Sequence, residues 1–361
     1  MSESMALVGL DVHQAQTVAV VLDPGTGELR VQRLRGEPAK VVPVFLEDLD
    51  CPVRAVYEAG PTGFALARVA EERGLDVRVV APGSIPRAPG DRVKTDRRDA
   101  KRLVRLFAAG ELSYAFVPSE TDEHFRDLVR CVEDARKDLM RCRHRLSKFL
   151  LRRGHRFPSK AWTQPHERWL CQIHFEDAPS RATFLDYLCA VQALVQRRRA
   201  LIGALEEAVP GSSHAETVAR LRCFRGIDTL TAAGLCAEVG DFHRFAKPAL
   251  LSGFLGVVPS EYTSDEKRVQ GQITKAGPPH ARRLLVEAAH HYRHRPAVGE
   301  GIAARQAGQD PRVVQIAWRC QRRLHERWTH LAGTRGKRTG TVAIACAREL
   351  AAFCWEAATL D

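Results

Sequence analysis

The sequence predicts an α/β domain at the N-terminus followed by a mainly helical remainder. Three observations predict this: apolar runs alternate with helical patterns up to residue 116, apolar residues recur every seven positions beyond it, and helical patterns fill the rest. The chain has 361 residues, 45% of them apolar, which is enough for two or three domains with sizeable cores. We expect domains at 1–116, 117–210, 211–300 and 301–361.

The first part of the chain is typical of five strands and two helices. The runs "ALVGLDV", "TVAVVLD" and "LRVQRL" predict three consecutive strands, the last two joined by the turn "PGTGE". The runs "VRAVYEAG" and "DVRVVAP" predict two more, with a helix after each that ends at Gly74 or Gly110. A three-strand meander followed by β-α-β-α is the order of an RNase H-like domain.

Two long helices are predicted next, because apolar residues repeat in two interleaved sets of spacing seven, as in a coiled coil. In the first helix the sets are Phe125, Val132, Leu139 and Leu146, and Leu128, Ala135, Cys142 and Phe149. In the second they are Phe184, Val191 and Leu205, interrupted by Arg198, and Leu188, Val195, Ile202 and Val209. We expect either an antiparallel hairpin or an arm that pairs with another subunit.

The charge of the chain points to a polyanionic partner. The net charge is +12 and the isoelectric point is about 9.5, for which nucleic acid is the default explanation. Residues 141–156 hold seven Arg or Lys and no acid, so we expect phosphate contacts there rather than a merely solvated face. The candidates are Arg141, Arg143, Arg145, Lys148, Arg152 and Arg153.

Cysteine usage and hydropathy narrow the class of protein further. The ten cysteines include no CxxC pair and mostly occupy apolar positions, which favours unpaired thiols in a cytoplasm over a disulfide or zinc framework. The N-terminus lacks a signal-peptide pattern, and no apolar run approaches the roughly 20 residues that span a bilayer.

Four acidic residues form the candidate metal site. Asp96 and Asp99 share one face of a helix, while Asp11 and Glu58 end the first and fourth predicted strands. A cluster of four carboxylates is tolerable only if some of them protonate or cations fill it, and oxygen ligands favour Mg²⁺ or Mn²⁺. Such ions assist phosphodiester transfer. The alternative for the helical pair alone is charge balance in the basic segment "RVKTDRRDAKRL".

These motifs resemble a known family. "GLDVHQ", "YEAGPTG" and "KTDRRDAKRL" resemble the DEDD motifs of the insertion-sequence 110 family of transposases, and residues 254–293 resemble that family's transposase domain. The resemblance covers residues 5–295 in the same order. It implies a RuvC-like N-terminal domain, a helical transposase domain, and excision and integration of DNA.

The resemblance also implies a nucleophilic serine after "LGVVPSE". Ser264 occupies that position, and Ser260 is the alternative because Asp265 stands where many relatives have glycine. Lys267, Arg268 and Lys275 would neutralise the phosphate. Metal ions at the four acids would activate the serine or stabilise the leaving oxygen.

The family further implies donor and target DNA, a structured non-coding bridge RNA, and a composite site in a dimer or tetramer in the bacterial cytoplasm. Three other functions remain open on the residues alone. They are a RuvC-like nuclease that uses water, a non-catalytic RNA-binding scaffold, and an actin-like ATPase or sugar kinase, for which an adenosine loop is not found.

Overall fold

The computed structural model describes residues 5–85, 95–264 and 267–360, without the side chains of residues 84, 262–264 and 267–269. The chain divides into two compact units, residues 1–119 and 120–361. The first boundary lies three residues from the predicted one at 116. The finer division of the second unit at 210 and 300 remains a prediction.

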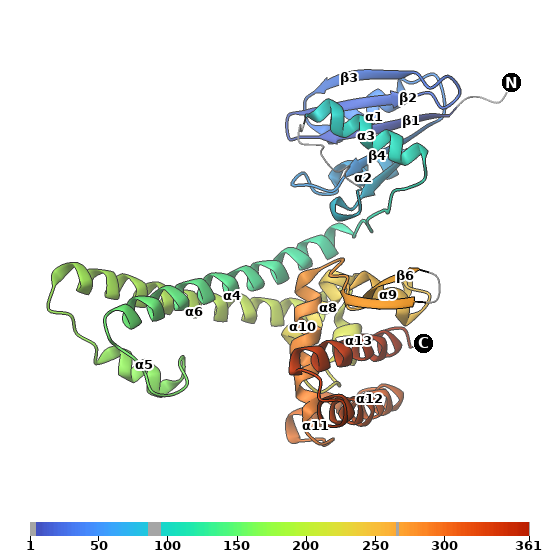
Figure 1. Cartoon of the computed structure of the whole chain (residues 1–361). Coiled ribbons are helices and arrows are strands. Elements are labelled where there is room, and N and C mark those ends of the chain that lie inside the picture. The colour runs from blue at the N-terminus through green and yellow to red at the C-terminus, as the bar shows by residue number, and fades with distance from the viewer. Residues whose placement is uncertain (1–4, 86–94, 265–266, 361) are drawn as a thin grey trace. The chain divides into compact units, whose positions relative to one another are not determined.

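The first unit is built on a five-stranded mixed sheet (Figure 1). The strands are β1 (Ala6–Val12), β2 (Gln16–Leu22), β3 (Leu29–Arg35), β4 (Val53–Glu58) and β5 (Asp76–Val80). Their order is β3-β2-β1-β4-β5, with β1–β2 and β2–β3 antiparallel and β1–β4 and β4–β5 parallel. This is the RNase H-like arrangement that the element order predicted, with β1 in the centre.

Helices cover both faces of this sheet. The helices α1 (Pro38–Glu47) and α2 (Ala65–Glu72) share an apolar core with one face, which includes Val8 and Tyr57. The helix α3 (Asp96–Ala108) packs on the other face, against Val18, Val20 and Val56. Successive residues of a strand point to opposite faces, so the odd-numbered residues of β1 face α3.

All five predicted strands and both predicted helices are present, within a few residues of their expected bounds. The helix α1 was not predicted. Its sequence contains Pro38 at the first position and Pro43 inside the helix. A proline inside a helix removes a backbone hydrogen-bond donor, so the sequence pattern argues against a helix here. The apolar spacing around these prolines nevertheless buries Val42, Phe45 and Leu46.

The second unit begins with a long helical hairpin, in which α4 (Glu120–Arg152) and α6 (Ala178–Ala208) lie side by side and α5 (Gln164–Cys171) sits between them in sequence (Figure 1). The helix α4 ends at Arg152, because Gly154 adopts a φ of 79°, which does not continue a right-handed helix.

The residues of spacing seven line the contact between the two helices. Of those on α4, only Leu128 is half-buried and the others are buried. On α6, Phe184, Val191 and Leu205 are buried. Of the interleaved set, Leu188, Val195 and Ile202 are half-buried, and Val209, just beyond the end of α6, is buried. An antiparallel hairpin is therefore present, while a supercoil and pairing with a second subunit remain predictions.

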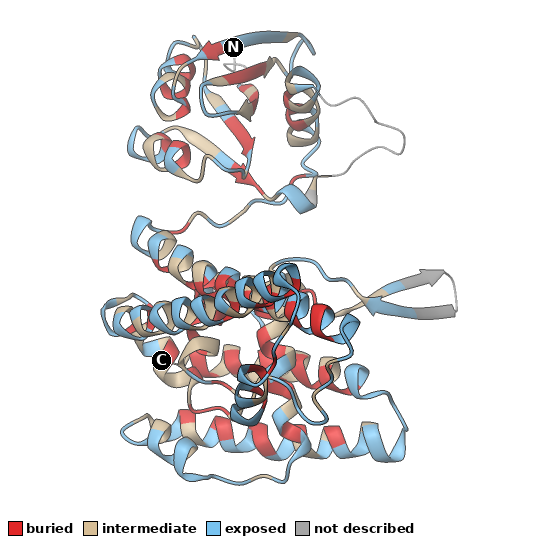
Figure 2. Cartoon of the chain, turned by 90° about the vertical axis from the view of Figure 1, so that its left-hand side faces the viewer, coloured by how far each residue is buried: buried red, intermediate tan, exposed pale blue. Residues whose placement is uncertain are grey.

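The rest of the second unit is a helical body. Its helices are α7 (Ala215–Leu221), α8 (Thr229–Val239), α9 (Pro248–Phe254), α10 (Pro279–Ala289), α11 (Glu300–Gln306), α12 (Pro311–Thr329) and α13 (Thr339–Ala358). One apolar core joins most of them to the first turns of α4 and the last turns of α6. The strands β6 (Pro259–Ser264) and β7 (Lys267–Ile273) form an antiparallel ribbon that projects from this body (Figure 2).

Two further expectations concern the cysteines and the membrane. All ten cysteines are free and six are buried, which confirms the prediction of unpaired thiols. Within the described residues, no helix combines the length and apolarity needed to cross a bilayer.

Candidate active site

The acidic residues of the first unit lie at one edge and on one face of its sheet. The register pairs Leu10 of β1 with Tyr57 of β4, so Asp11 and Glu58, one residue further on, stand at matching positions of neighbouring parallel strands. Both share their face with Gly9 and Val56, which contact α3. Asp11 and Glu58 thus occupy the side of the sheet that carries α3.

The helix α3 begins at this same face with the other two acids. Thr95 caps it by accepting a hydrogen bond from the backbone N–H of Arg98, and Asp96 and Asp99 fill its first turn. Negative side chains in the first turn interact favourably with the helix dipole, which gives these residues a structural role besides any catalytic one.

Three side chains meet closely at this edge. The Nε2 atom of His13 lies 3.3 Å from Oδ2 of Asp11 and 3.6 Å from Oδ1 of Asp96. One ligand atom from each of the three lies within 4.8 Å of the other two, a spacing that a single metal ion could bridge. No other such group occurs among the described residues.

The electrostatics of Asp11 indicate a site that favours a cation. Burial raises the pKa of the Asp11 carboxyl, the charges of Asp96 and Asp99 raise it further, and His13 opposes both effects. A raised pKa means that the ionised carboxylate lacks enough positive charge around it. A bound divalent ion would supply that charge.

Asp99 and Glu58 lie near the group of Asp11, His13 and Asp96 but are not part of it. Oδ1 of Asp99 accepts a hydrogen bond from Arg102 at 3.1 Å, whereas Oδ2 is buried without a hydrogen-bond partner among the described residues. Glu58 is exposed at the end of β4. We name the set of Asp11, His13, Glu58, Asp96 and Asp99 the carboxylate edge.

Gly9 sets the distance between β1 and α3. A Cβ atom at this position would lie 2.5 Å from the carbonyl oxygen of Ala100 and 2.8 Å from the backbone nitrogen of Val104. Only a residue without a side chain allows the helix to approach this closely. Because α3 carries Asp96 and Asp99, the close packing at Gly9 positions both acids relative to Asp11.

The predicted nucleophile lies in the β6–β7 ribbon of the second unit. Ser264 is the last residue of β6 and pairs with Lys267, the first residue of β7. The side chains of Ser264, Lys267 and Arg268 lie outside the described residues. The alternative, Ser260, is half-buried near the base of the ribbon, where its Oγ lies above Gly271 of the opposite strand.

The base of this ribbon is held by close backbone packing. Gly277 has a φ of 64°, and a Cβ there would lie 1.8 Å from the carbonyl oxygen of Phe254. Nη1 of Arg282 donates to the carbonyl oxygens of Leu255 and Ala276 at 2.8 and 2.6 Å. The exposed Lys275, with a φ of 56°, belongs to this same junction.

A buried ionic network fixes α4 to the helical body. Glu133 accepts hydrogen bonds from Arg136 and Arg283 at 2.7 Å, and Glu238 accepts from Arg130 at 3.0 Å. His280 lies 3.8 Å from Glu133 and 3.4 Å from Glu238. The network thus joins α4 and α8 to α10, the helix that follows the ribbon. Its members are Arg130, Glu133, Arg136, Glu238, His280 and Arg283.

The basic segment of α4 separates into two groups. Arg141, Arg145, Lys148 and Arg152 are exposed and spaced by four, three and four residues, so they form one stripe along the helix. Within it, Arg141 forms an ion pair with Asp138 at 2.7 Å and Arg145 donates to Sγ of Cys142.

The other two basic candidates contact aromatic rings. The half-buried Arg143 lies over Trp162, and Arg153, just beyond the helix, lies 5.6 Å from the ring centre of Phe149. We name the group of Arg141, Arg145, Lys148 and Arg152 the basic stripe. Arg143 and Arg153 therefore face different surroundings from the stripe.

Sequence reasoning missed His13 as a member of the site. A usable signal was present in "GLDVHQ", because residues two apart on a strand share a face and His13 follows Asp11 at that spacing. It also missed the ionic network, whose members are spread over 153 residues from Arg130 to Arg283. Only the folded chain brings these residues together.

Comparison with known proteins gives consistent matches. A family model for DEDD transposases of the IS110 type matches residues 8–153, and one described as "Transposase IS116/IS110/IS902 family" matches residues 218–300. A putative transposase, y4qE, of Sinorhizobium fredii is 39% identical over 97% of this chain and 87% of its own length. The transposase for insertion sequence element IS1533 of Leptospira borgpetersenii is 33% identical over 91% of this chain and 97% of its own length.

Proposed function

Because the chain belongs to the IS116/IS110/IS902 family of transposases and is an enzyme that acts on DNA, we propose that it cuts and rejoins DNA with a serine nucleophile assisted by the carboxylate edge. The observation that carries this proposal is the meeting of Asp11, His13 and Asp96 at the end of β1, on the face shared by Glu58 and Asp99.

The carboxylate edge would hold a divalent cation. The ligands would be Asp11, Asp96 and His13, with Asp99 and Glu58 available beside them, and the buried, unpartnered Oδ2 of Asp99 is an acceptor suited to this role. Carboxylates favour Mg²⁺ or Mn²⁺, and an imidazole nitrogen among the ligands suits a transition-metal ion better than Mg²⁺. When bound, the ion would stabilise negative charge on phosphate oxygens.

Ser264 would supply the nucleophile. Its Oγ attacks the scissile phosphorus and loses its proton, one P–O bond of the DNA breaks, and the leaving strand's oxygen takes up a proton. The number of phosphodiester bonds is conserved, because a serine ester replaces the one that breaks. A strand's free hydroxyl can then reverse the step and reseal DNA without ATP.

The two parts of this site come from different units of the chain. Catalysis requires them to meet on DNA, within one protomer or between the protomers of a dimer or tetramer. We further propose that a structured RNA transcribed from the element selects donor and target DNA, and the net charge of +12 is compatible with two nucleic-acid partners.

A trapped covalent adduct tests the serine. Labelled DNA that carries the element's ends and flanks is incubated with the protein, the element's own RNA and Mn²⁺, and the products are separated in detergent. We expect a labelled protein band from the wild type and from Ser260→Ala, and none from Ser264→Ala. If Ser264→Ala still cuts DNA and leaves no adduct, water is the nucleophile and the serine proposal is wrong.

A purification experiment tests the RNA. Protein expressed from the whole element, with its flanking non-coding DNA, is purified in high salt and its bound RNA is sequenced. We expect a discrete RNA from the element's flanks. A random sample of cellular transcripts would contradict guidance and favour unspecific binding by a basic surface.

A further inference from the structure

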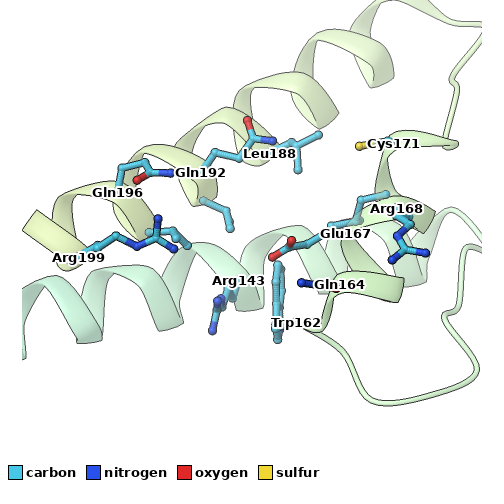
Figure 3. Close-up of a pocket in the computed structure, with 13 residues that line it drawn as sticks. Arg143, Trp162, Gln164, Glu167, Arg168, Cys171, Leu188, Gln192, Gln196 and Arg199 are labelled. Atoms are coloured by element: carbon cyan, nitrogen blue, oxygen red, sulfur yellow. The ribbon is translucent and has the colours of Figure 1, made fainter.

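The end of the α4–α6 hairpin that carries α5 contains a cavity of about 490 Å³ (Figure 3). Arg143 of α4 forms one side, Trp162 and α5 form the second, and residues 188–199 of α6 form the third. The volume falls within the range of small-molecule sites. We name this cavity the tip pocket.

The lining of the tip pocket combines three kinds of surface. Its apolar walls come from Leu170, Leu188, Val191 and Val195. Three glutamines at positions 164, 192 and 196 offer both amide donors and acceptors. Three arginines against a single glutamate leave the lining with an excess of positive charge.

A contact between a cation and an aromatic ring forms one side of this pocket. The guanidinium carbon of Arg143 lies 4.8 Å from the ring centre of Trp162. The Nε atom of Arg143 is buried without a hydrogen-bond partner among the described residues, and burial lowers the pKa of this side chain. The Arg143 side chain is nevertheless a cation that lines the pocket, and it can attract an incoming acceptor group.

Aromatic packing holds Trp162 in place. Trp162 has a φ of 64°, a conformation that is uncommon for a bulky residue and that surrounding contacts must maintain. The ring of the buried His166 lies 5.0 Å from that of Trp162 and 5.0 Å from that of Phe157. Trp162 is therefore held by a small aromatic cluster.

We propose that the tip pocket binds one unpaired nucleotide of a nucleic-acid strand. The base would lie between the apolar walls and against Arg143 and Trp162, since bases stack on both aromatic rings and guanidinium planes. The glutamines and Glu167 would hydrogen-bond the base edge, and Arg168 and Arg199 at the rim would bind the flanking phosphates. A base in a duplex is paired and stacked, so duplex nucleic acid does not enter.

Alkylation of the wild-type protein tests the proposal directly. Cys171 lines the tip pocket, whereas Cys189 on α6 does not, and both are exposed. Iodoacetamide modification of each is followed by peptide mass spectrometry, with and without a saturating 12-nucleotide single strand of RNA or DNA. We expect the strand to slow modification of Cys171 at least fivefold and that of Cys189 less than 1.5-fold. Equal slowing of both, or of neither, would overturn the proposal.

Matched variants locate the effect within the pocket. Gln192→Trp fills the cavity without changing the charge. Arg199→Gln removes a positive charge at the rim of the pocket, and its control, Arg197→Gln, removes a positive charge from the same helix outside the pocket. By fluorescence anisotropy, we expect Gln192→Trp to weaken single-strand binding at least tenfold, Arg199→Gln about fivefold, and Arg197→Gln less than twofold. Duplex binding should not change. Equal losses for the two arginine variants would mean diffuse electrostatic binding and would contradict the pocket.

Two choices keep the result independent of catalysis and of folding. All binding is measured in EDTA, so failure here leaves the strand-cleavage proposal intact. Thermal unfolding checks each variant, and Gln196→Trp, which blocks the same wall one turn later, replaces Gln192→Trp if that variant is unstable. The strand type that protects Cys171 at the lower concentration identifies the nucleotide as RNA or DNA.

Discussion

The carboxylate edge and the β6–β7 ribbon are the two halves of the proposed site, and they are built in opposite ways. The edge stands on a central strand and a helix that pack across a buried core, with Gly9 allowing backbone contact between them. The ribbon has two strands that project from its unit, and no described residue from 259 to 273 joins an apolar core. An isolated two-stranded ribbon is marginally stable, so we infer that the acids are preorganised and that the serine's position depends on substrate.

The largest expected effect comes from Asp11→Asn. Cleavage should fall at least about 10³-fold, because loss of a metal ligand removes several kcal/mol of charge stabilisation in the transition state. In EDTA the same variant should melt at a higher temperature than the wild type. The pKa of Asp11 is raised in the folded protein, so its ionised form opposes folding at neutral pH, and this penalty fades as the pH falls through the folded pKa.

The metal dependence of stability supplies the control for Asp11→Asn. Mn²⁺ at ten times its dissociation constant should stabilise the wild type by about 1.4 kcal/mol, by mass action. The exposed Asp50→Asn variant should respond as the wild type does, and Asp11→Asn should not respond. Equal stabilisation of all three proteins by Mn²⁺ would remove the metal from the carboxylate edge.

Next in size is Glu238→Gln, which breaks the ionic network that joins α4, α8 and α10. Burial alone would raise the pKa of Glu238, but hydrogen bonds and charges from His280 and Arg130 outweigh it and lower the pKa to about 2. Glu238 is buried whereas its partner Arg130 is half-exposed, so losing these charge-assisted hydrogen bonds should cost about 2–3 kcal/mol at pH 7, measured by urea unfolding. The loss should persist above pH 4.5 and shrink as the pH falls towards 2, since a lowered carboxyl pKa stabilises the fold only while the group is ionised.

A double-mutant cycle with Arg130→Gln separates the ion pair from the general effect of substitution. We expect the two losses to be non-additive, because each variant removes the same pair. Additive losses would mean that Arg130 and Glu238 act independently and that the network does not anchor α4.

Gly277→Ala should disrupt the packing at the base of the ribbon, and Gly308→Ala is its control. Both glycines have positive φ angles, 64° and 72°, but a new Cβ would clash with Phe254 only at Gly277. Backbone strain alone costs about 1 kcal/mol, and the clash should bring the loss at Gly277 to at least about 2 kcal/mol. We expect Gly277→Ala to lower cleavage more than Gly308→Ala at equal folded fractions. Equal effects would show that the base of the ribbon tolerates movement.

Gly9→Ala introduces a similar steric clash into the carboxylate edge. The added methyl group would overlap α3, with an expected loss of about 1–2 kcal/mol in the free energy of unfolding. It should also weaken stabilisation by Mn²⁺, because α3 carries Asp96. The control is Gly83→Ala, where a Cβ meets nothing within 4 Å. Unchanged Mn²⁺ stabilisation in Gly9→Ala would mean that the acids do not depend on the close packing.

The smallest effect is expected from the basic stripe. Lys148→Gln and Arg152→Gln should each reduce the salt dependence of duplex DNA binding by about one unit of slope, as expected for one lost phosphate contact. Arg322→Gln, exposed on α12, serves as the control of equal charge. Slopes that stay unchanged for the stripe would exclude it as a phosphate-binding surface.

Much of the carboxylate edge could be predicted from the sequence, because β1, β4 and α3 are regular elements whose periodicity sets the side that each acid faces. Asp11 and Asp96 do meet, as predicted. Glu58 and Asp99 lie around that meeting point rather than in it, and a sequence pattern does not resolve side-chain positions at this scale. The helix α1 escaped prediction because its prolines oppose local propensity, and tertiary packing overrides that signal.

The ribbon and the tip pocket were beyond sequence reasoning for another reason. The family resemblance pointed to Ser264, but nothing in the local pattern indicated a ribbon with Gly277 packed under Phe254. The tip pocket needs Arg143 and Arg199 to approach from separate helices, and their charges alone indicated only a basic surface. Predicting such contacts requires the register between helices, which a heptad pattern narrows but does not fix.

The length of α4 has a consequence for how this hairpin can change. Glu133 of the ionic network and Arg143 of the tip pocket are ten residues apart on one continuous helix, about 15 Å along its axis. A one-residue insertion between them would rotate everything beyond it by about 100° and turn the tip away from its anchor. Seven residues added to both α4 and α6 would restore the facing to within about 20° and move the tip outward by about 10 Å. The hairpin can therefore be lengthened without reorienting its tip only by insertions of about seven residues in both α4 and α6.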